Sequence, residues 1–258
     1  MEKMQVIKRR GKVEELNLNK VHNMVEEACE GLSGVSASQV EIQSNLQFHD
    51  NIRTEDIQEI LIRSASDLID LEHPNYQYVA ARLLSVQLRK KLFGRNRKHP
   101  HIKDHLFKGA EKGIYDPNLW ASYNDVEWDR INNYIDYDRD DQFTYAGLRQ
   151  VVDKYLVQDR STGEIYESPQ QMYILIAATI FSVYPLETRL KYVKDYYDAI
   201  SKHQLNLPTP IMAGVRTPIR QYASCVLVDT DDTLDSIFSS DMAIGKYVAQ
   251  RAGIGINA

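Results

Sequence analysis

The chain of 258 residues has little cysteine and lacks the short motifs of several common enzyme classes. Its two cysteines, Cys29 and Cys225, form no CxxC pair, which excludes a disulfide scaffold and a zinc ribbon and fits a reducing compartment. No GxxxxGK[ST], GxGxxG or HExxH occurs, and the seven histidines show no metal-ligand spacing. The sequence therefore predicts no P-loop, no dinucleotide fingerprint and no metal site.

Long apolar runs and a strong positive charge are also missing. The longest apolar run, residues 172–183, is too short to span a bilayer, and the opening MEKMQVIKRR has no apolar stretch after its charges. The net charge of -5 argues against a general nucleic-acid binder. We therefore expect a cytoplasmic protein with neither membrane nor nucleic acid as a partner.

Basic residues do gather in two places, Lys8 to Lys12 and Arg95 to Lys98. Such clusters are usually solvated faces or linkers. The first has a second interpretation, because a triphosphate needs several cations. A hairpin can aim Lys8 and Arg9 toward a helix start, and Thr54 and Gln58 share one helix face. Both a charged surface hairpin and a nucleotide pocket remain open at this point.

The first 94 residues predict a hairpin followed by four helices. Two short strands in residues 5–16 flank an Arg10-Gly11 turn, and Asn19 is expected to cap a helix reaching Gly31. Thr54 is expected to cap the third helix. The four helices are expected at 19–31, 37–48, 54–68 and 75–92. The polar, basic segment 94–100 predicts a domain boundary.

The rest of the chain predicts more helices and then an α/β segment. Ser168-Pro169 begins a helix that is apolar nearly all round and should be buried, and Ser161–Gly163 is a turn between short strands. Further helices are expected at 101–112, 124–135, 142–156 and 187–201. Pro208-Thr209-Pro210 predicts an extended loop. A strand at SCVLV, a helix at 232–251 and a strand at GIGINA predict parallel pairing.

Residues 5–94 resemble the ATP-cone domain, in which a nucleotide switches an attached enzyme on or off. The likeness is carried by VIKRRGKVEELNLNKVH, NIRTEDIQEILIRSASDLI and YQYVAARLLSVQLRKKLFG. It implies an allosteric site for ATP or dATP. The residues implied are Lys8, Arg9, Glu14, Leu16, Asn17, Lys20, Phe48, Thr54, Gln58 and Lys90. Two positions depart from the family pattern: Gln58 replaces a common His and Glu27 a common aromatic, so inhibition by dATP stays open.

A second constellation surrounds Cys225. Ser224 and Cys225 open a strand, and Gly253 leaves backbone N–H groups approachable by a phosphate. Taken alone, a single cysteine is more often structural, and Gly253-Ile254-Gly255 is more often a tight start of a strand.

The whole chain resembles the N-terminal part of the large (alpha) subunit of class I ribonucleotide reductase, in its bacterial and phage aerobic members acting on diphosphates. The matching motifs include YLVQDRSTGEIYESPQQMYILIAATIFSVYP, LPTPIMAGVRTP, SCVLV, DTLDSI and QRAGIGINA. The resemblance implies that Cys225 is half of a redox-active pair. It implies substrate contacts at Thr209, Ser224, Cys225, Ala252 and Gly253, and a dNTP specificity-effector site at Asp232, Thr233 and Leu234.

The resemblance also implies an architecture and partners. We expect a mainly α chain with α/β: an ATP cone at 5–94, a helical domain at 95–205 and the first strands of a ten-stranded α/β barrel at 206–258. No metal is expected here, because the radical cofactor belongs to the small (beta) subunit. Further partners are a second large subunit, thioredoxin or glutaredoxin, and a complementary C-terminal portion, since we expect a truncated record or a split gene that is inactive alone.

Two other functions are weighed against this one. A stand-alone nucleotide-sensing ATP-cone regulator would carry paired CxxC motifs and a basic balance, and this chain has neither. A purely structural helical module would leave Thr209, Ser224 and Cys225 unexplained.

Overall fold

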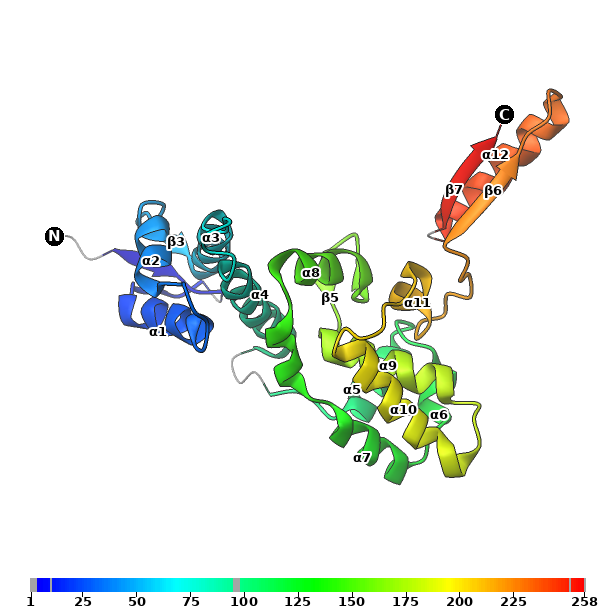
Figure 1. Ribbon diagram of the computed structural model, residues 1–258, viewed down its shortest axis with the longest axis horizontal. Coiled ribbons are helices and arrows are strands. Elements are labelled where there is room, and N and C mark those ends of the chain that lie inside the picture. Colours follow the sequence, from blue (N-terminus) through cyan, green and yellow to red (C-terminus); the bar gives the residue numbers. More distant parts are fainter. Residues whose placement is uncertain (1–3, 10, 95–97, 251, 258) are drawn as a thin grey trace. The chain divides into compact units, whose positions relative to one another are not determined.

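The computed structural model describes residues 4–9, 11–94, 98–250 and 252–257. The chain divides into two compact units, residues 1–98 with 138–153 and residues 99–137 with 154–258. Helices dominate both (Figure 1), which confirms the mainly α class with a few strands. Arg10, Arg95 and Arg97 of the two basic clusters lie outside the described residues.

The first unit begins with a three-stranded sheet in the order β2-β1-β3. The strands β1 (Gln5–Ile7) and β2 (Val13–Glu15) form the predicted antiparallel hairpin, and Gly11 takes a φ of 79° beside its turn. The sequence analysis missed β3 (Ile52–Arg53), which pairs in parallel with β1. Two residues are too few to show a period of two, so no pattern could reveal this strand.

Four helices accompany this sheet in the first unit, as predicted, and a fifth joins them from later in the chain. They are α1 (Leu18–Cys29), α2 (Ala37–Asn45), α3 (Thr54–Asp67) and α4 (Tyr76–Phe93). Their core includes Val25, Leu61 and Leu83, all with no exposed surface. The 3₁₀ helix η2 (Tyr137–Gln142) leads to α8 (Tyr145–Gln150), which packs on α4.

Two predicted helix caps in the first unit were wrong. Asn17, rather than Asn19, caps α1, and its side chain accepts a hydrogen bond from the Lys20 backbone N–H at 3.2 Å. Thr54 is the first residue of α3, and Arg53 holds the cap position because β3 runs directly into the helix. Both errors shift a helix start by one or two residues and leave the helix itself in place.

The second unit starts with α5 (Ile102–Glu111), α6 (Pro117–Ala121) and α7 (Asp125–Tyr134).

The predicted single helix at 142–156 was wrong. Thr144 caps α8 by accepting from the Gly147 N–H, so residues before it cannot belong to that helix. After Gln150 the chain continues as a π-helical turn, η3 (Val151–Tyr155).

Two packed helices follow the short hairpin β4 (Gln158–Asp159) and β5 (Glu164–Ile165), which confirms the predicted turn. Ser168 and Gln171 form the predicted capping box of α9 (Pro169–Phe181), and residues 172–178 are buried all round. Helix α10 (Leu186–Ser201) packs along α9. The core of this unit therefore lies around α9.

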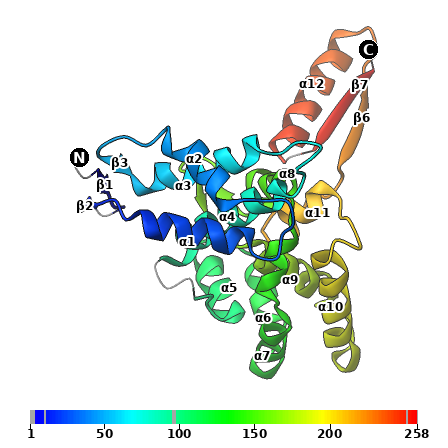
Figure 2. The same cartoon turned by 60° about the vertical axis from the view of Figure 1, so that its left-hand side comes forward.

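The last part of the second unit corrects one prediction and confirms another. Pro208-Thr209-Pro210 is no extended loop, because Thr209 and Pro210 form the first turn of α11 (Thr209–Gly214), where proline is tolerated. Beyond it, β6 (Cys225–Asp229), α12 (Leu234–Ala249) and β7 (Gly253–Asn257) form the predicted strand–helix–strand unit. Figure 2 shows the two parallel strands side by side with α12 along them. The ten-stranded barrel itself stays a prediction.

Candidate functional site

Two of the cationic side chains predicted to bind a nucleotide, Lys8 and Arg9, form ion pairs with carboxylates in this structure. The Lys8 ammonium lies 3.5 Å from the Glu14 carboxylate, which also pairs with Lys12 at 3.0 Å. The hydrogen bond and charge of Lys12 lower the pKa of Glu14. The Arg9 guanidinium pairs with Glu55 at 3.0 Å. These side chains are partly or fully exposed to solvent, so each pair contributes little stability and a stronger anion can replace its carboxylate.

Arg9 also connects the hairpin to the end of α4. Its Nη1 donates to the Lys90 carbonyl oxygen at 3.0 Å. The Lys90 ammonium in turn donates to the Gln58 side-chain oxygen at 3.0 Å and lies 3.5 Å from the Met24 sulfur. The structure therefore brings Arg9, Gln58 and Lys90 into one contact network formed by the hairpin, α3 and α4.

The other residues predicted to bind the nucleotide lie near this network. Within the part of the chain that the structure describes, none of them forms a side-chain hydrogen bond or ion pair with Arg9, Gln58 or Lys90. Leu16 donates its backbone N–H to Met4, and Asn17 caps α1, which places the exposed Lys20 on the first turn of that helix. Phe48 is half-buried just after α2, and Thr54 opens α3 next to Glu55. The arrangement offers cations near two helix starts, where backbone N–H groups favour anions.

Cys225 and Gly253 face each other across the parallel strands β6 and β7. They are register partners, and the Gly253 N–H donates to the Ser224 carbonyl at 3.1 Å. A Cβ on Gly253 would lie 3.0 Å from that same oxygen, so the close approach of the strands favours glycine. The Ser224 hydroxyl lies 3.8 Å from the Cys225 sulfur, and both residues are exposed. Ala252, directly before the strand, is buried.

Thr209 and the predicted effector residues occupy two helix starts. Thr209 is exposed on the first turn of α11, and no contact among the described residues joins it to Ser224 or Cys225. Thr233 caps α12 by accepting from the Ser236 N–H at 3.2 Å, with Asp232 exposed before it and Leu234 exposed after it. These three neighbours thus surround one helix N-terminus.

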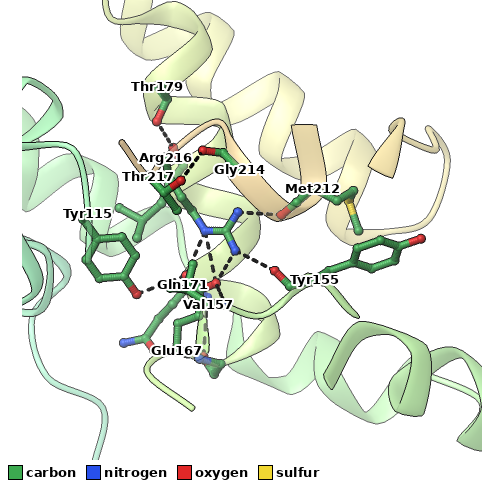
Figure 3. Close-up of polar contacts among 12 residues, drawn as sticks. Tyr115, Tyr155, Val157, Glu167, Gln171, Thr179, Met212, Gly214, Arg216 and Thr217 are labelled. Atoms are coloured by element: carbon green, nitrogen blue, oxygen red, sulfur yellow. Dashed lines mark hydrogen bonds and ion pairs between the residues drawn. The ribbon is translucent and has the colours of Figure 1, made fainter. Parts of the chain in front are cut away.

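A buried ion pair holds the segment that carries Thr209, and the sequence analysis missed it. Arg216 and Glu167 have no exposed surface, and Arg216 Nε lies 2.9 Å from a Glu167 oxygen. Figure 3 shows the guanidinium also donating to the backbone carbonyls of Met212, at 2.6 Å, and Tyr155, at 3.0 Å. The pair ties the end of α11 to the residues that precede α9.

Two further side chains extend this pair into a chain of hydrogen bonds. The buried Tyr115 hydroxyl donates to Glu167 at 3.1 Å, so its oxygen accepts from the His105 ring nitrogen at 2.9 Å. Burial lowers the pKa of His105 to about 4, and burial raises the pKa of Tyr115 well above its usual range. Both groups are therefore neutral at pH 7. The only sequence signal for this network was the single charged residue of the motif LPTPIMAGVRTP, Arg216.

Comparisons with known proteins agree along the chain. Residues 4–91 match the ATP cone domain, and residues 141–220 match the family described as "Ribonucleotide reductase, all-alpha domain". The chain is 54% identical over 253 residues to "Ribonucleoside-diphosphate reductase 1 subunit alpha" of Escherichia coli, which covers 98% of this chain and 33% of the relative. The corresponding alpha subunits of Haemophilus influenzae and phage T4 are 53% and 40% identical, over 99% and 100% of this chain and 34% of each relative.

The chain matches the N-terminal region of ribonucleotide reductase large subunits, with an ATP cone domain followed by the all-alpha domain of that family. It spans about a third of the length of the curated relatives it matches. The ATP cone supports nucleotide regulation of this family member. Because the likeness continues beyond the cone to almost the whole chain, the comparisons favour a large subunit over a stand-alone nucleotide-sensing regulator.

Two further observations concern this large-subunit chain as far as the structure describes it. Within residues 4–9, 11–94, 98–250 and 252–257, no group of three or more His, Cys, Asp or Glu side chains could hold a metal ion. None of the helices described there has both the length and the apolar character needed to cross a membrane.

Proposed function

We propose that this chain is the nucleotide-regulated N-terminal part of a class I ribonucleoside-diphosphate reductase. The enzyme reduces ribonucleoside diphosphates to deoxyribonucleoside diphosphates by a radical mechanism. The observation that carries the proposal is a single continuous likeness: 54% identity over 98% of the chain, through both the ATP cone and the Cys225 strand. The domain order proposed is an ATP cone at 5–94, a helical domain at 95–205 and the start of a catalytic α/β barrel at 206–258.

The cone is proposed to bind ATP or dATP as an activity switch. The network that joins Arg9, Gln58 and Lys90 supports this, because it places two cations at the hairpin and the end of α4. The partly exposed pairs Lys8–Glu14 and Arg9–Glu55 are weak, so a triphosphate can replace the carboxylates. The remaining proposed contacts are Leu16, Asn17, Lys20, Phe48 and Thr54.

Cys225 is proposed to supply one of the two thiols that reduce the ribose. Replacing the 2′-hydroxyl by hydrogen takes two electrons: two thiols become one disulfide, and the hydroxyl leaves as water. The only other cysteine, Cys29, is half-buried in the ATP-cone match, so the second thiol has to come from another polypeptide segment. Thioredoxin or glutaredoxin would reduce the disulfide again, and the small subunit would supply the radical.

The remaining proposed contacts belong to the substrate and to a specificity effector. Ser224 and Gly253 meet beside Cys225, which supports a substrate site completed by Thr209 and Ala252. The helix N-terminus at Asp232, Thr233 and Leu234 suits an anionic dNTP effector. We propose a cytoplasmic enzyme that acts as a homodimer of large subunits together with its small subunit.

A complementary C-terminal portion of the large subunit is the last proposed partner. The strand–helix–strand unit exposes large apolar side chains on each of its elements, with Leu227 85%, Phe238 65% and Ile256 60% exposed. Surfaces of this kind are normally covered by further protein. Additional barrel strands beside β6 and β7 would cover them.

The test is a CDP-reduction assay with the radical-bearing small subunit. We expect turnover when the chain is combined with a complementary C-terminal portion that supplies the second thiol, and none when Cys225→Ser replaces the native chain in that mixture. Turnover by the Cys225→Ser mixture at the native rate would overturn the proposed role of Cys225. Absence of turnover in the complete native mixture would overturn the proposed function.

A further inference from the structure

The side chain of Gln58 is almost completely buried in the cone, with 4% of its surface exposed. A buried amide needs partners for both of its ends. Its nitrogen donates to the Leu83 carbonyl at 3.1 Å, and its oxygen accepts from the Lys90 ammonium at 3.0 Å. Gln58 therefore uses both ends of its amide to join α3 to two successive parts of α4.

The Lys90 side chain reaches this amide by running back along its own helix. Leu83 and Lys90 lie seven residues apart, which is two helical turns, and helical side chains point toward the N-terminus. The ammonium also lies 3.5 Å from the Met24 sulfur on α1. Three helices thus fix where the Lys90 charge lies.

Gln58 offers Lys90 a neutral partner, whereas Glu55 offers Arg9 a charged one. Glu55 and Gln58 lie three residues apart on α3, so they share one helix face. Glu55 gives Arg9 a carboxylate at 3.0 Å, and Gln58 gives Lys90 an amide oxygen. An amide oxygen orients an ammonium group without adding a negative charge beside it.

We propose that Gln58 is a positioning residue of the nucleotide site: it orients the Lys90 ammonium toward the phosphate groups of ATP without neutralising its charge. This rests on the proposed ATP binding by the cone. Gln58 then acts through Lys90 instead of contacting the base or ribose itself. Replacing Gln58 should therefore weaken the binding of a ligand that carries phosphate groups and leave the binding of adenosine unchanged.

The test compares ATP with adenosine, which keeps the base and ribose and has no phosphate. ATP binding to the chain is measured by calorimetry, and adenosine binding by NMR titration. Gln58→Met keeps the side-chain length and removes both hydrogen bonds, so ATP affinity should fall roughly tenfold or more, as expected for a lost hydrogen bond to a charged group. Adenosine affinity should stay at the wild-type value.

A double-mutant cycle with Lys90→Met separates positioning from a general loss of structure. In the Lys90→Met background, Gln58→Met should cause no further loss of ATP affinity, because the group that it orients is gone. Glu55→Gln is the matched control on the same helix face, and it should not weaken ATP binding. Thermal unfolding of each variant checks that the cone is folded.

The outcomes are distinct. If the wild-type chain binds no ATP, the proposed function fails. If the wild type binds ATP and Gln58→Met binds it equally well, or loses adenosine affinity to the same degree, the positioning role is overturned. If Gln58→Met does not fold, Gln58→Glu decides: its carboxylate should neutralise Lys90 and lower ATP affinity, and unchanged affinity would contradict the inference.

Discussion

Arg216 and Glu167 form a fully buried ion pair that connects two segments 49 residues apart in the chain. Glu167 directly precedes the cap of α9, and Arg216 follows α11, the helix that begins at Thr209. Each charge has additional backbone partners, Met212 and Tyr155 for the guanidinium and the Val157 N–H for the carboxylate. The pair thus holds α11, the helix that carries the proposed substrate contact Thr209, against the residues that precede α9.

Removing one partner of this pair should strongly destabilise the second unit. We expect Arg216→Met to lower the free energy of unfolding by about 3–5 kcal/mol, because it leaves a buried carboxylate without its cation. Adding Glu167→Gln should recover part of that loss, since the uncompensated charge is removed while an acceptor remains. Urea denaturation followed by tryptophan fluorescence measures this, because Trp120 and Trp128 both belong to the same unit.

Arg220→Met is the matched control for this prediction. Arg220 pairs with Asp116 at 2.5 Å, but its side chain is 54% exposed. Arg220→Met should therefore lower the free energy of unfolding by less than about 1 kcal/mol. Equal losses of unfolding free energy for Arg216→Met and Arg220→Met would mean that burial does not increase the contribution of the Arg216–Glu167 pair to stability.

His105 should make the chain lose stability in mild acid. Its pKa is lowered to about 4 by burial, so between pH 6.5 and 4 the unfolded state binds a proton that the folded state does not. Stability therefore falls as pH drops below 6.5 and this contribution levels off below about 4. From pH 7 to pH 5 the loss should be about 2 kcal/mol.

The comparison is with His105→Gln, whose amide can still donate to Tyr115. Urea denaturation at pH 7 and at pH 5 should show a smaller loss for the variant than for the wild type. Identical pH dependence of the two proteins would show that His105 is not buried in its neutral form.

The two cysteines should differ sharply in reactivity. Burial raises the pKa of Cys29 to about 11, which lowers its thiolate fraction roughly a hundredfold relative to an ordinary protein thiol. Cys225 is exposed. Iodoacetamide at pH 7.5, followed by peptide mass mapping, should therefore modify Cys225 first.

Cys225→Ser provides the control for this experiment, because the remaining thiol should then react slowly until urea unfolds the chain. Equal alkylation of both cysteines in the folded protein would contradict the burial of Cys29. Selective alkylation of Cys225 would agree with the proposed chemistry, which requires this thiol to be accessible.

Local signals predicted much of the fold. The capping box of Ser168 and Gln171 placed the start of α9, and the parallel pairing of β6 and β7 followed from the strand–helix–strand pattern. The errors arose where local signals compete. Asn17 and Asn19 are equally good caps by type, and Pro208 and Pro210 suit either a loop or the first turn of α11.

Long-range contacts were beyond the sequence. Nothing near Glu167 indicates Arg216, because a buried charge is recognised only once its partner in space is known. Likewise, spacing showed that Thr54 and Gln58 share a face of α3, but it did not show that Gln58 binds Lys90, 32 residues later. Residue type and spacing suggested some of the predicted site residues and the family resemblance completed the set, whereas the contacts of Arg9 and Lys90 came from the fold.

ATP binding by the chain tests the central claim most directly. In calorimetry the wild-type protein should bind ATP, and the double variant Lys8→Ala/Arg9→Ala should not, because two cations proposed for the phosphates are lost. Lys191→Ala is a matched control, since this exposed lysine pairs with Asp195 one turn further along α10 and is not among the residues proposed to bind ATP. Saturable ATP binding that disappears in the double variant and persists in the control is the predicted result. No ATP binding by the wild type, or equal binding by the double variant, would contradict the account.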